Sequence, residues 1–138
     1  LVLVPVHRLL LASALPLPAF CRYAAVVCLL GGRALTIAAL VTLCRHTGFD
    51  QHGQALRLVT GGPFALVRHP IAVGLGWTCL GLVLAWPSWL VLSGFLGCCA
   101  VQDRRLRQEE ALLAERFGQA YADYATRVGR LWPRRPKG

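Results

Sequence analysis

The sequence predicts an all-α fold: a multi-pass transmembrane helical protein with a helical hairpin and a cytosolic C-terminal helix extension, formed by one domain. Of its 138 residues, 56% are apolar and only 15% are charged, whereas soluble domains carry about a quarter charged residues. Its 15 basic side chains give a net charge of +9, and they lie at the ends of apolar runs, as the positive-inside rule describes for membrane proteins. These features exclude a disordered chain and argue against nucleic-acid binding.

The first half of the chain predicts one complete membrane helix. Residues 1–22 are apolar but interrupted by prolines, and we interpret them as part of a first helix. Residues 23–44 are apolar for long enough to cross a membrane and are predicted as a transmembrane helix. Residues 45–70 are polar and contain a Gly-Gly-Pro turn signal at 61–63, so they are predicted as a cytoplasmic loop.

The second half predicts a hairpin that continues into the cytosol. Residues 71–103 are predicted as a transmembrane hairpin, because two apolar arms flank a Trp-Pro-Ser-Trp turn at 86–89. Small residues recur on both arms, so we expect the arms to pack closely on each other. The sequence then turns polar without a helix breaker, and residues 104–133 are predicted as cytosolic or interfacial helices.

Basic residues also predict the orientation. Arg104, Arg105 and Arg107 form a basic turn after the last apolar run. This turn predicts an integral membrane protein, surrounded by the lipid bilayer, with the loop 45–70, the C-terminus and any active site formed by them on the cytoplasmic side. Six cysteines lie in or beside apolar runs without a CxxC pair, so we interpret them as packing thiols and predict no metal site.

Two polar clusters are expected to meet at the open end of the hairpin. Arg68 and His69 precede Pro70 at the start of one arm, and Glu109 and Glu110 follow the other arm. Free amide groups at the helix start would bind an anion, and the two acids opposite would bind a cation. Together they would hold a zwitterion, although a histidine at a helix start and a pair of glutamates also occur as a cap and a solvated face.

These clusters occur within a longer pattern that resembles a known family, the isoprenylcysteine carboxyl methyltransferases and phospholipid N-methyltransferases of membranes. The resemblance covers roughly residues 53–133, more than half of the chain. It is carried by Leu58-Val59-Thr60-Gly61-Gly62-Pro63-Phe64, Val67-Arg68-His69-Pro70-Ile71, Gly74, Glu109-Glu110, Leu113, Arg116-Phe117-Gly118, Tyr121, Tyr124, Val128 and Pro133.

The resemblance implies a membrane enzyme that binds S-adenosylmethionine and methylates a lipid or lipidated acceptor, such as a prenylcysteine-like carboxylate, at the cytoplasmic face. It implies His69 and Glu110 as catalytic residues. It also implies a cofactor pocket formed by Arg68, His69, Pro70, Gly74, Arg105, Glu109 and Glu110.

One position departs from the family pattern. The family usually has tyrosine two residues after the proline, where this chain has Ala72, and the loss of an aromatic wall beside the cofactor would weaken binding, change the acceptor or abolish activity. Two alternatives therefore stay open: an inactive or non-enzymatic membrane homologue, and an NADPH-dependent reductase of the sterol type, which also carries an arginine-histidine-proline element.

Overall fold

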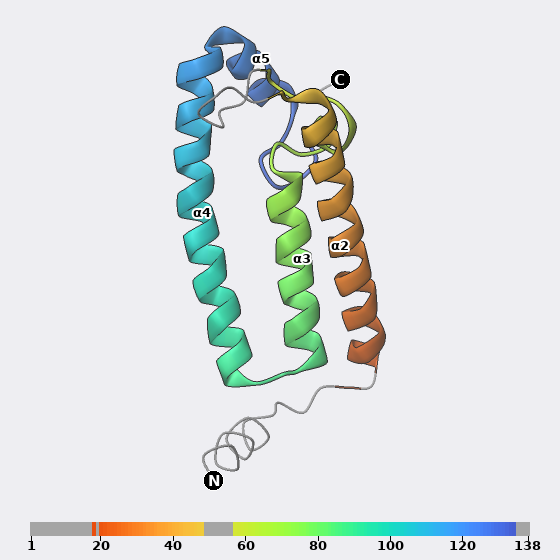
Figure 1. Ribbon diagram of the computed structural model, residues 1–138. Coiled ribbons are helices and arrows are strands. Elements are labelled where there is room, and N and C mark those ends of the chain that lie inside the picture. Colours follow the sequence, from red (N-terminus) through yellow and green to blue (C-terminus); the bar gives the residue numbers. More distant parts are fainter. Residues whose placement is uncertain (1–17, 19, 49–56, 135–138) are drawn as a thin grey trace.

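The predicted all-helical fold is confirmed for the part of the chain that the computed structural model describes, residues 18, 20–48 and 57–134. Four α-helices and one short 3₁₀-helix occur there, and no strand (Figure 1). In chain order they are α2 (Phe20–His46), η1 (Gly62–Ala65), α3 (Pro70–Ala85), α4 (Trp89–Phe117) and α5 (Gln119–Arg127). Most of the first-helix segment predicted at 1–22, and part of the predicted loop, lie outside the described residues.

Helices α2 and α3 form the closest pair of the fold and run side by side (Figure 1). Gly32 of α2 and Gly74 of α3 face each other so closely that a Cβ at position 32 would lie 2.5 Å from the Gly74 carbonyl oxygen. The absence of side chains at both positions lets the two backbones meet, as in small-residue contacts between membrane helices.

This pairing corrects the expectation that the hairpin arms α3 and α4 pack closely on each other. A Cβ at Gly94 or Gly97 of α4 would meet nothing within 4 Å, so these small residues do not mediate a helix contact. Gly74, Thr78 and Gly81 of α3 instead face α2, which the sequence pattern did not distinguish from α4 because glycine spacing identifies a face but not its partner.

A short turn connects α3 to α4 at the end opposite α5 (Figure 1). The buried Ser88 caps α4 by accepting a hydrogen bond from the Val91 amide at 3.2 Å. From Trp89 to Phe117 the helix then continues without a break, through the apolar and the polar part of its sequence. Gly118, with a φ of +49°, ends α4 and turns the chain into α5.

Among the described helices, α2 alone is long and apolar enough to cross a membrane. Helix α3 is apolar but has 16 residues, which corresponds to about 24 Å at 1.5 Å per residue, against a hydrocarbon core of about 30 Å. Helix α4 is longer but polar in its second half. The helix lengths therefore support one crossing directly.

Candidate functional site

The two polar clusters meet where α3 begins and α4 passes by. His69 Nε2 lies 3.1 Å from Glu110 Oε1, and Arg68 Nη1 lies 3.1 Å from the same oxygen. On the other side of the imidazole ring, Nδ1 lies 3.8 Å from Glu109 Oε2. Because an ionised carboxylate only accepts hydrogen bonds, Nε2 carries a proton in this arrangement, and in the neutral ring Nδ1 keeps its lone pair.

The local sequence explains how His69 reaches this position. A residue before proline is driven out of helical geometry, and His69 has φ −124° and ψ 64°. Pro70 takes the first position of α3, where its missing N–H costs nothing. The His69 side chain is thereby directed across to α4 and is only 5% exposed, so its contact with the largely buried Glu110 is shielded from water, whereas Glu109 is 58% exposed.

A segment after α5, residues 128–133, completes the cluster, and we call it the C-terminal strap. The Arg68 amide donates to the Gly129 carbonyl at 2.8 Å, and the His69 amide donates to the Arg130 carbonyl at 3.3 Å. These two amides precede α3 and are not the free amides of the helix start that we expect to bind an anion. They are already satisfied by the strap, which pairs with Val67 in a parallel bridge.

Arg130 on this strap is a site residue that the sequence reasoning missed. Its Nε lies 3.2 Å from Glu110 Oε2, and its Nη1 donates to Asp103 Oδ1 at 2.9 Å. Both carboxylate oxygens of Glu110 are therefore engaged by positive or donor groups. The sequence contained a signal for such a residue. Asp103 and Glu110 are two turns apart on a face of α4 that also carries the buried Leu106. Acids on a face that packs against the protein need a basic partner.

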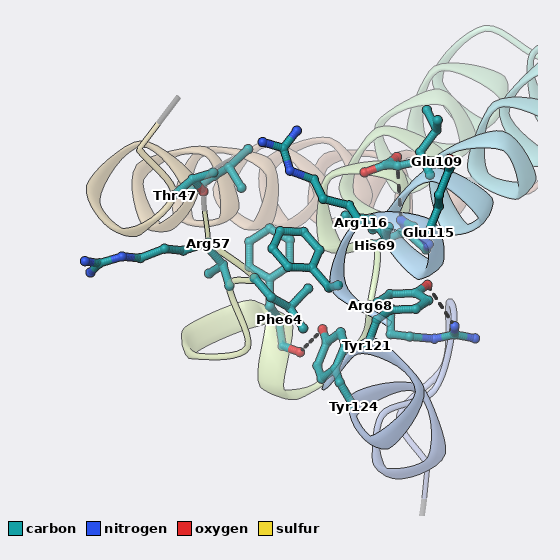
Figure 2. Close-up of a pocket in the computed structure, with 16 residues that line it drawn as sticks. Thr47, Arg57, Phe64, Arg68, His69, Glu109, Glu115, Arg116, Tyr121 and Tyr124 are labelled. Carbon is teal, nitrogen blue, oxygen red and sulfur yellow. Dashed lines mark hydrogen bonds and ion pairs between the residues drawn. The ribbon is translucent and has the colours of Figure 1, made fainter. Parts of the chain in front are cut away.

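A pocket with a volume of about 850 Å³ lies beside this cluster, and we call it the polar pocket. In Figure 2, Glu109 lies next to His69, and Arg68 lies beside Tyr121, to which it donates a hydrogen bond. The pocket is lined by Leu43, Thr47, Arg57, Leu58, Val59, Phe64, Arg68, His69, Glu109, Leu112, Leu113, Glu115, Arg116, Phe117, Tyr121 and Tyr124.

Two tyrosines of α5 fix the lower wall of the polar pocket. Tyr121 accepts a hydrogen bond from Arg68 Nη1 at 3.2 Å, and Tyr124 donates to the Phe64 carbonyl at 2.6 Å (Figure 2). Burial raises the pKa of the Tyr121 hydroxyl, although Arg68 acts in the opposite direction. Burial, with the neighbouring Tyr121, raises the pKa of Tyr124 to about 12. Both hydroxyls are therefore neutral donors or acceptors at ordinary pH.

Two polar atoms of the polar pocket lack a protein partner. Among the described residues, Thr47 Oγ1 and Arg68 Nε are buried without a hydrogen bond, and both side chains line the pocket. Buried polar groups are normally paired, so these atoms suit a ligand with polar groups at two places. Together with the acid, the imidazole and the aromatic walls, they fit a compact zwitterion that carries a flat ring.

The structure brings some of the predicted site residues together and separates others. Arg68, His69 and Glu109 line the polar pocket, and Glu110 supports them from behind. Pro70 is fully buried at the start of α3. The other lining residues come from the end of α2 and Thr47, from residues 57–59, and from η1, α4 and α5.

Two predicted cofactor residues lie away from the polar pocket. Gly74 faces Gly32 and Thr36 of α2, so the structure gives it a role in helix packing. Arg105 is exposed on α4 and is not among the lining residues, because it lies one turn before Glu109, toward the apolar part of the helix.

Ala72, the departure from the family pattern, lies on a different wall. It lines a second pocket between α3 and α4, which we call the lateral pocket, and it is not a lining residue of the polar pocket. The aromatic side chain that the pattern leads one to expect here would therefore have narrowed the lateral pocket. Among the described residues, no group of three or more His, Cys, Asp and Glu side chains is arranged to hold a metal ion.

The fold and the site thus define a helical protein whose acid-histidine-arginine cluster borders a pocket sized for a small molecule. The sequence profile of the phospholipid methyltransferase family matches residues 20–120 of the 138. The chain belongs to this family of methyltransferases, which confirms the family resemblance predicted from the motifs. A search of curated proteins finds no matching relative.

Proposed function

We propose that this protein transfers a methyl group from S-adenosylmethionine to a lipid or lipidated acceptor at the cytoplasmic face of a membrane. The family supports methyl transfer. The observation that carries the rest is the polar pocket, which is lined by Glu109, His69 and Arg68 together with aromatic side chains such as Phe64 and Tyr121.

The polar pocket matches the chemistry of this cofactor. When bound, S-adenosylmethionine supplies an electrophilic methyl group on a positively charged sulfur. Glu109 is placed to attract its ammonium group, and the Arg68 Nε that lacks a protein partner is placed to bind its carboxylate. The apolar and aromatic side chains supply a wall for the adenine ring, and the Thr47 hydroxyl is free to bind a polar edge of the nucleoside.

The residues of the cluster divide the remaining work between positioning and proton acceptance. Methyl transfer depends mainly on alignment and exclusion of water, and no protein nucleophile is needed. Glu110, held by Arg68 and Arg130, orients His69 by accepting from Nε2. For an amine acceptor, His69 Nδ1 is then the proton acceptor of choice, while a carboxylate acceptor requires none.

A multi-pass arrangement in the membrane accounts for the distribution of exposed side chains. Large apolar side chains are exposed along α2, α3 and the first half of α4, as expected for surfaces that face lipid. Exposed Trp86 and Trp89 at the turn suit one membrane interface. Basic residues at the C-terminal end of α2 and in the middle of α4 suit the cytoplasmic interface, so the polar pocket faces the cytoplasm.

An NADPH-dependent reductase and a non-enzymatic homologue are the competing functions. The family match favours methyl transfer over reduction. The departure at Ala72 gave the main reason to expect inactivity, but Ala72 lines the lateral pocket and therefore leaves the walls of the polar pocket complete.

Calorimetric titration of the purified protein in detergent tests the proposal. We expect saturable binding of S-adenosylmethionine by the wild type, none by His69→Ala or Glu110→Ala, and unchanged binding by Asp123→Asn. Asp123 is a matched control because it is an exposed acid whose contacts are local to α5. Absence of heat for the wild type would reject the proposal, and saturable binding of NADPH instead would favour the reductase.

Recovery of labelled methyl groups from native membranes then identifies the acceptor. Label in the lipid fraction or in a lipidated protein or peptide supports transfer to a membrane acceptor. Label in neither, with cofactor binding intact, would contradict the enzyme and favour the non-enzymatic homologue.

A further inference from the structure

Helix α2 packs on α3 through one face and leaves the opposite face exposed. Gly32 lies against α3, whereas Leu30 is 68% exposed and Ile37 is 60% exposed. The exposed residues follow one another at alternating distances of three and four, which is the spacing of a seam along which one helix packs on another. We call this row the outer seam, and it consists of Tyr23, Val26, Leu30, Arg33, Ile37, Leu40 and Cys44.

Arg33 is the charged member of the outer seam, and it is the central residue of the 27-residue helix. About 20 Å of helix lies on either side of it, at 1.5 Å per residue. Arg33 is exposed, and it forms no hydrogen bond or ion pair with the residues that the structure describes. The outer seam is therefore apolar on both sides of an unpaired positive charge.

Neither lipid nor water suits the whole of this seam. With the middle of α2 at the middle of a bilayer, Arg33 lies in hydrocarbon, where a charged side chain is costly unless it faces protein or a water-filled cavity. With α2 displaced until Arg33 reaches the headgroups, half of the helix leaves the hydrocarbon and exposed side chains such as Ile37 and Leu40 meet water. A second helix that covers the seam and brings a carboxylate to Arg33 removes both conflicts.

The acids of this chain are poorly placed to supply that carboxylate. Of the six acidic residues, five follow the apolar half of α4, and the first of them, Asp103, is already paired with Arg107 and Arg130. The sixth, Asp50, follows the end of α2 by four residues. These span at most about 14 Å, against about 20 Å of helix back to Arg33. A second copy in the same orientation offers the same acids at the same levels.

From these observations we propose that the outer seam binds a membrane helix from outside these 138 residues, apolar in sequence and with one carboxylate at the level of Arg33. Arginine suits this role because its guanidinium binds both carboxylate oxygens at once. Ala34 and Ala38 are exposed beside the seam and are small enough to let the backbone of a partner approach. The inference rests on the proposed function only for the membrane placement of α2, not for the reaction.

Two synthetic helices serve as partners in the test. Each contains about 20 residues of leucine and alanine, enough to cross a bilayer, with lysines at both ends; one has glutamate at its centre and the other has leucine. The full chain is reconstituted in phosphatidylcholine vesicles, and energy transfer from its four tryptophans to a dansyl group on the peptide measures association. Arg33→Leu is the test variant. Arg22→Leu is its matched control, because Arg22 is an exposed arginine at the start of the same helix but lies off the seam.

We expect the wild type and Arg22→Leu to bind the glutamate peptide roughly tenfold more tightly than the leucine peptide. In Arg33→Leu the two peptides should bind equally. Cross-linking then locates the contact: a benzophenone side chain in place of Leu30 on the seam should capture the glutamate peptide. The same side chain in place of Leu82, an exposed residue of α3, should not.

Equal binding of the two peptides by the wild type, or a preference for the glutamate peptide that survives Arg33→Leu, would overturn the proposal. So would equal capture from positions 30 and 82. Cross-links from position 30 to a second copy, or to residues 1–17 of the same chain, in the absence of peptide would also overturn it, because the seam would then have another occupant.

Calorimetry with S-adenosylmethionine on the same vesicles separates this proposal from the proposed function. Arg33 does not line the polar pocket, so Arg33→Leu should bind the cofactor like the wild type. A wild type that binds the cofactor but does not distinguish the peptides rejects only the helix partner. A wild type that distinguishes the peptides but binds no cofactor rejects only the proposed reaction.

Discussion

Replacing Gly74 by alanine tests whether this glycine serves helix packing or the cofactor. A Cβ at position 74 meets Thr36 Oγ1, and it lies 2.6 Å from the Gly32 carbonyl oxygen and 3.0 Å from the Thr36 amide nitrogen. The last two are backbone atoms of α2, which cannot move aside by a change of rotamer. Alanine therefore fits only if α2 and α3 move apart.

The size of the effect follows from a matched control on the same helix. A Cβ at Gly76 meets nothing within 4 Å, and both substitutions gain the same helix propensity, about 1 kcal/mol. Gly74→Ala alone adds an overpacking cost of about 1–3 kcal/mol. The two variants should thus differ in free energy of unfolding by about 2 kcal/mol, with Gly76→Ala above the wild type.

Thermal unfolding in detergent, followed by tryptophan fluorescence, measures this difference. Trp77 of α3 is a suitable reporter because its ring lies against α2: a Cβ at Gly31 would be 3.8 Å from the ring atom Cε3. Separation of the two helices therefore changes the surroundings of this ring. Below its midpoint, Gly74→Ala should bind S-adenosylmethionine like the wild type. Equal midpoints for the two variants would refute the packing argument, and an unchanged midpoint with lost binding would return Gly74 to the cofactor pocket.

Other predictions concern the polar pocket and its support. Arg130→Gln should weaken S-adenosylmethionine binding roughly tenfold in calorimetry, because Glu110 loses a charged partner, whereas Arg107→Gln, which removes an exposed ion pair, should not; equal losses would contradict this. Thr47→Val should weaken the same binding roughly fivefold without lowering the thermal midpoint, since the hydroxyl has no hydrogen-bond partner among the described residues. Burial raises the pKa of Tyr124 to about 12. The protonated hydroxyl therefore stabilises the fold fully at any pH below the ordinary tyrosine pKa of about 10, and this stabilisation is lost as the pH rises toward about 12. The wild-type midpoint should fall over that pH range, and less in Tyr124→Phe; identical profiles would contradict the prediction.

The meeting of His69 with Glu109 and Glu110 was predictable because topology alone produces it. A hairpin returns the chain to the level at which it began, so residues just before one arm and just after the other become neighbours. Pro70 marks the start of the first arm, and the absence of a breaker after Val101 extends the second arm to the acids. Neither inference needs knowledge of which helices touch.

The contacts that sequence reasoning misplaced depend on the identity of a partner. The spacing of Gly74 identifies an approachable face of α3, but α2 and the other hairpin arm are equally apolar candidates. Arg130 reaches the site only because Gly118 turns α5 back toward α3, and no periodic pattern in the chain encodes that return. Ala72 was expected beside the cofactor because it replaces the tyrosine of the family pattern, yet in the structure this position of α3 lines the lateral pocket.

The C-terminal strap holds the residues of the polar pocket in place. Its carbonyls satisfy the amides of Arg68 and His69, and its Arg130 pairs with Glu110, the partner of His69, and with Asp103. Methyl transfer depends on precise alignment of donor and acceptor, so a side chain that supports the cluster from outside the pocket contributes to alignment without touching the ligand. A change in the strap should therefore weaken cofactor binding although no strap residue lines the polar pocket.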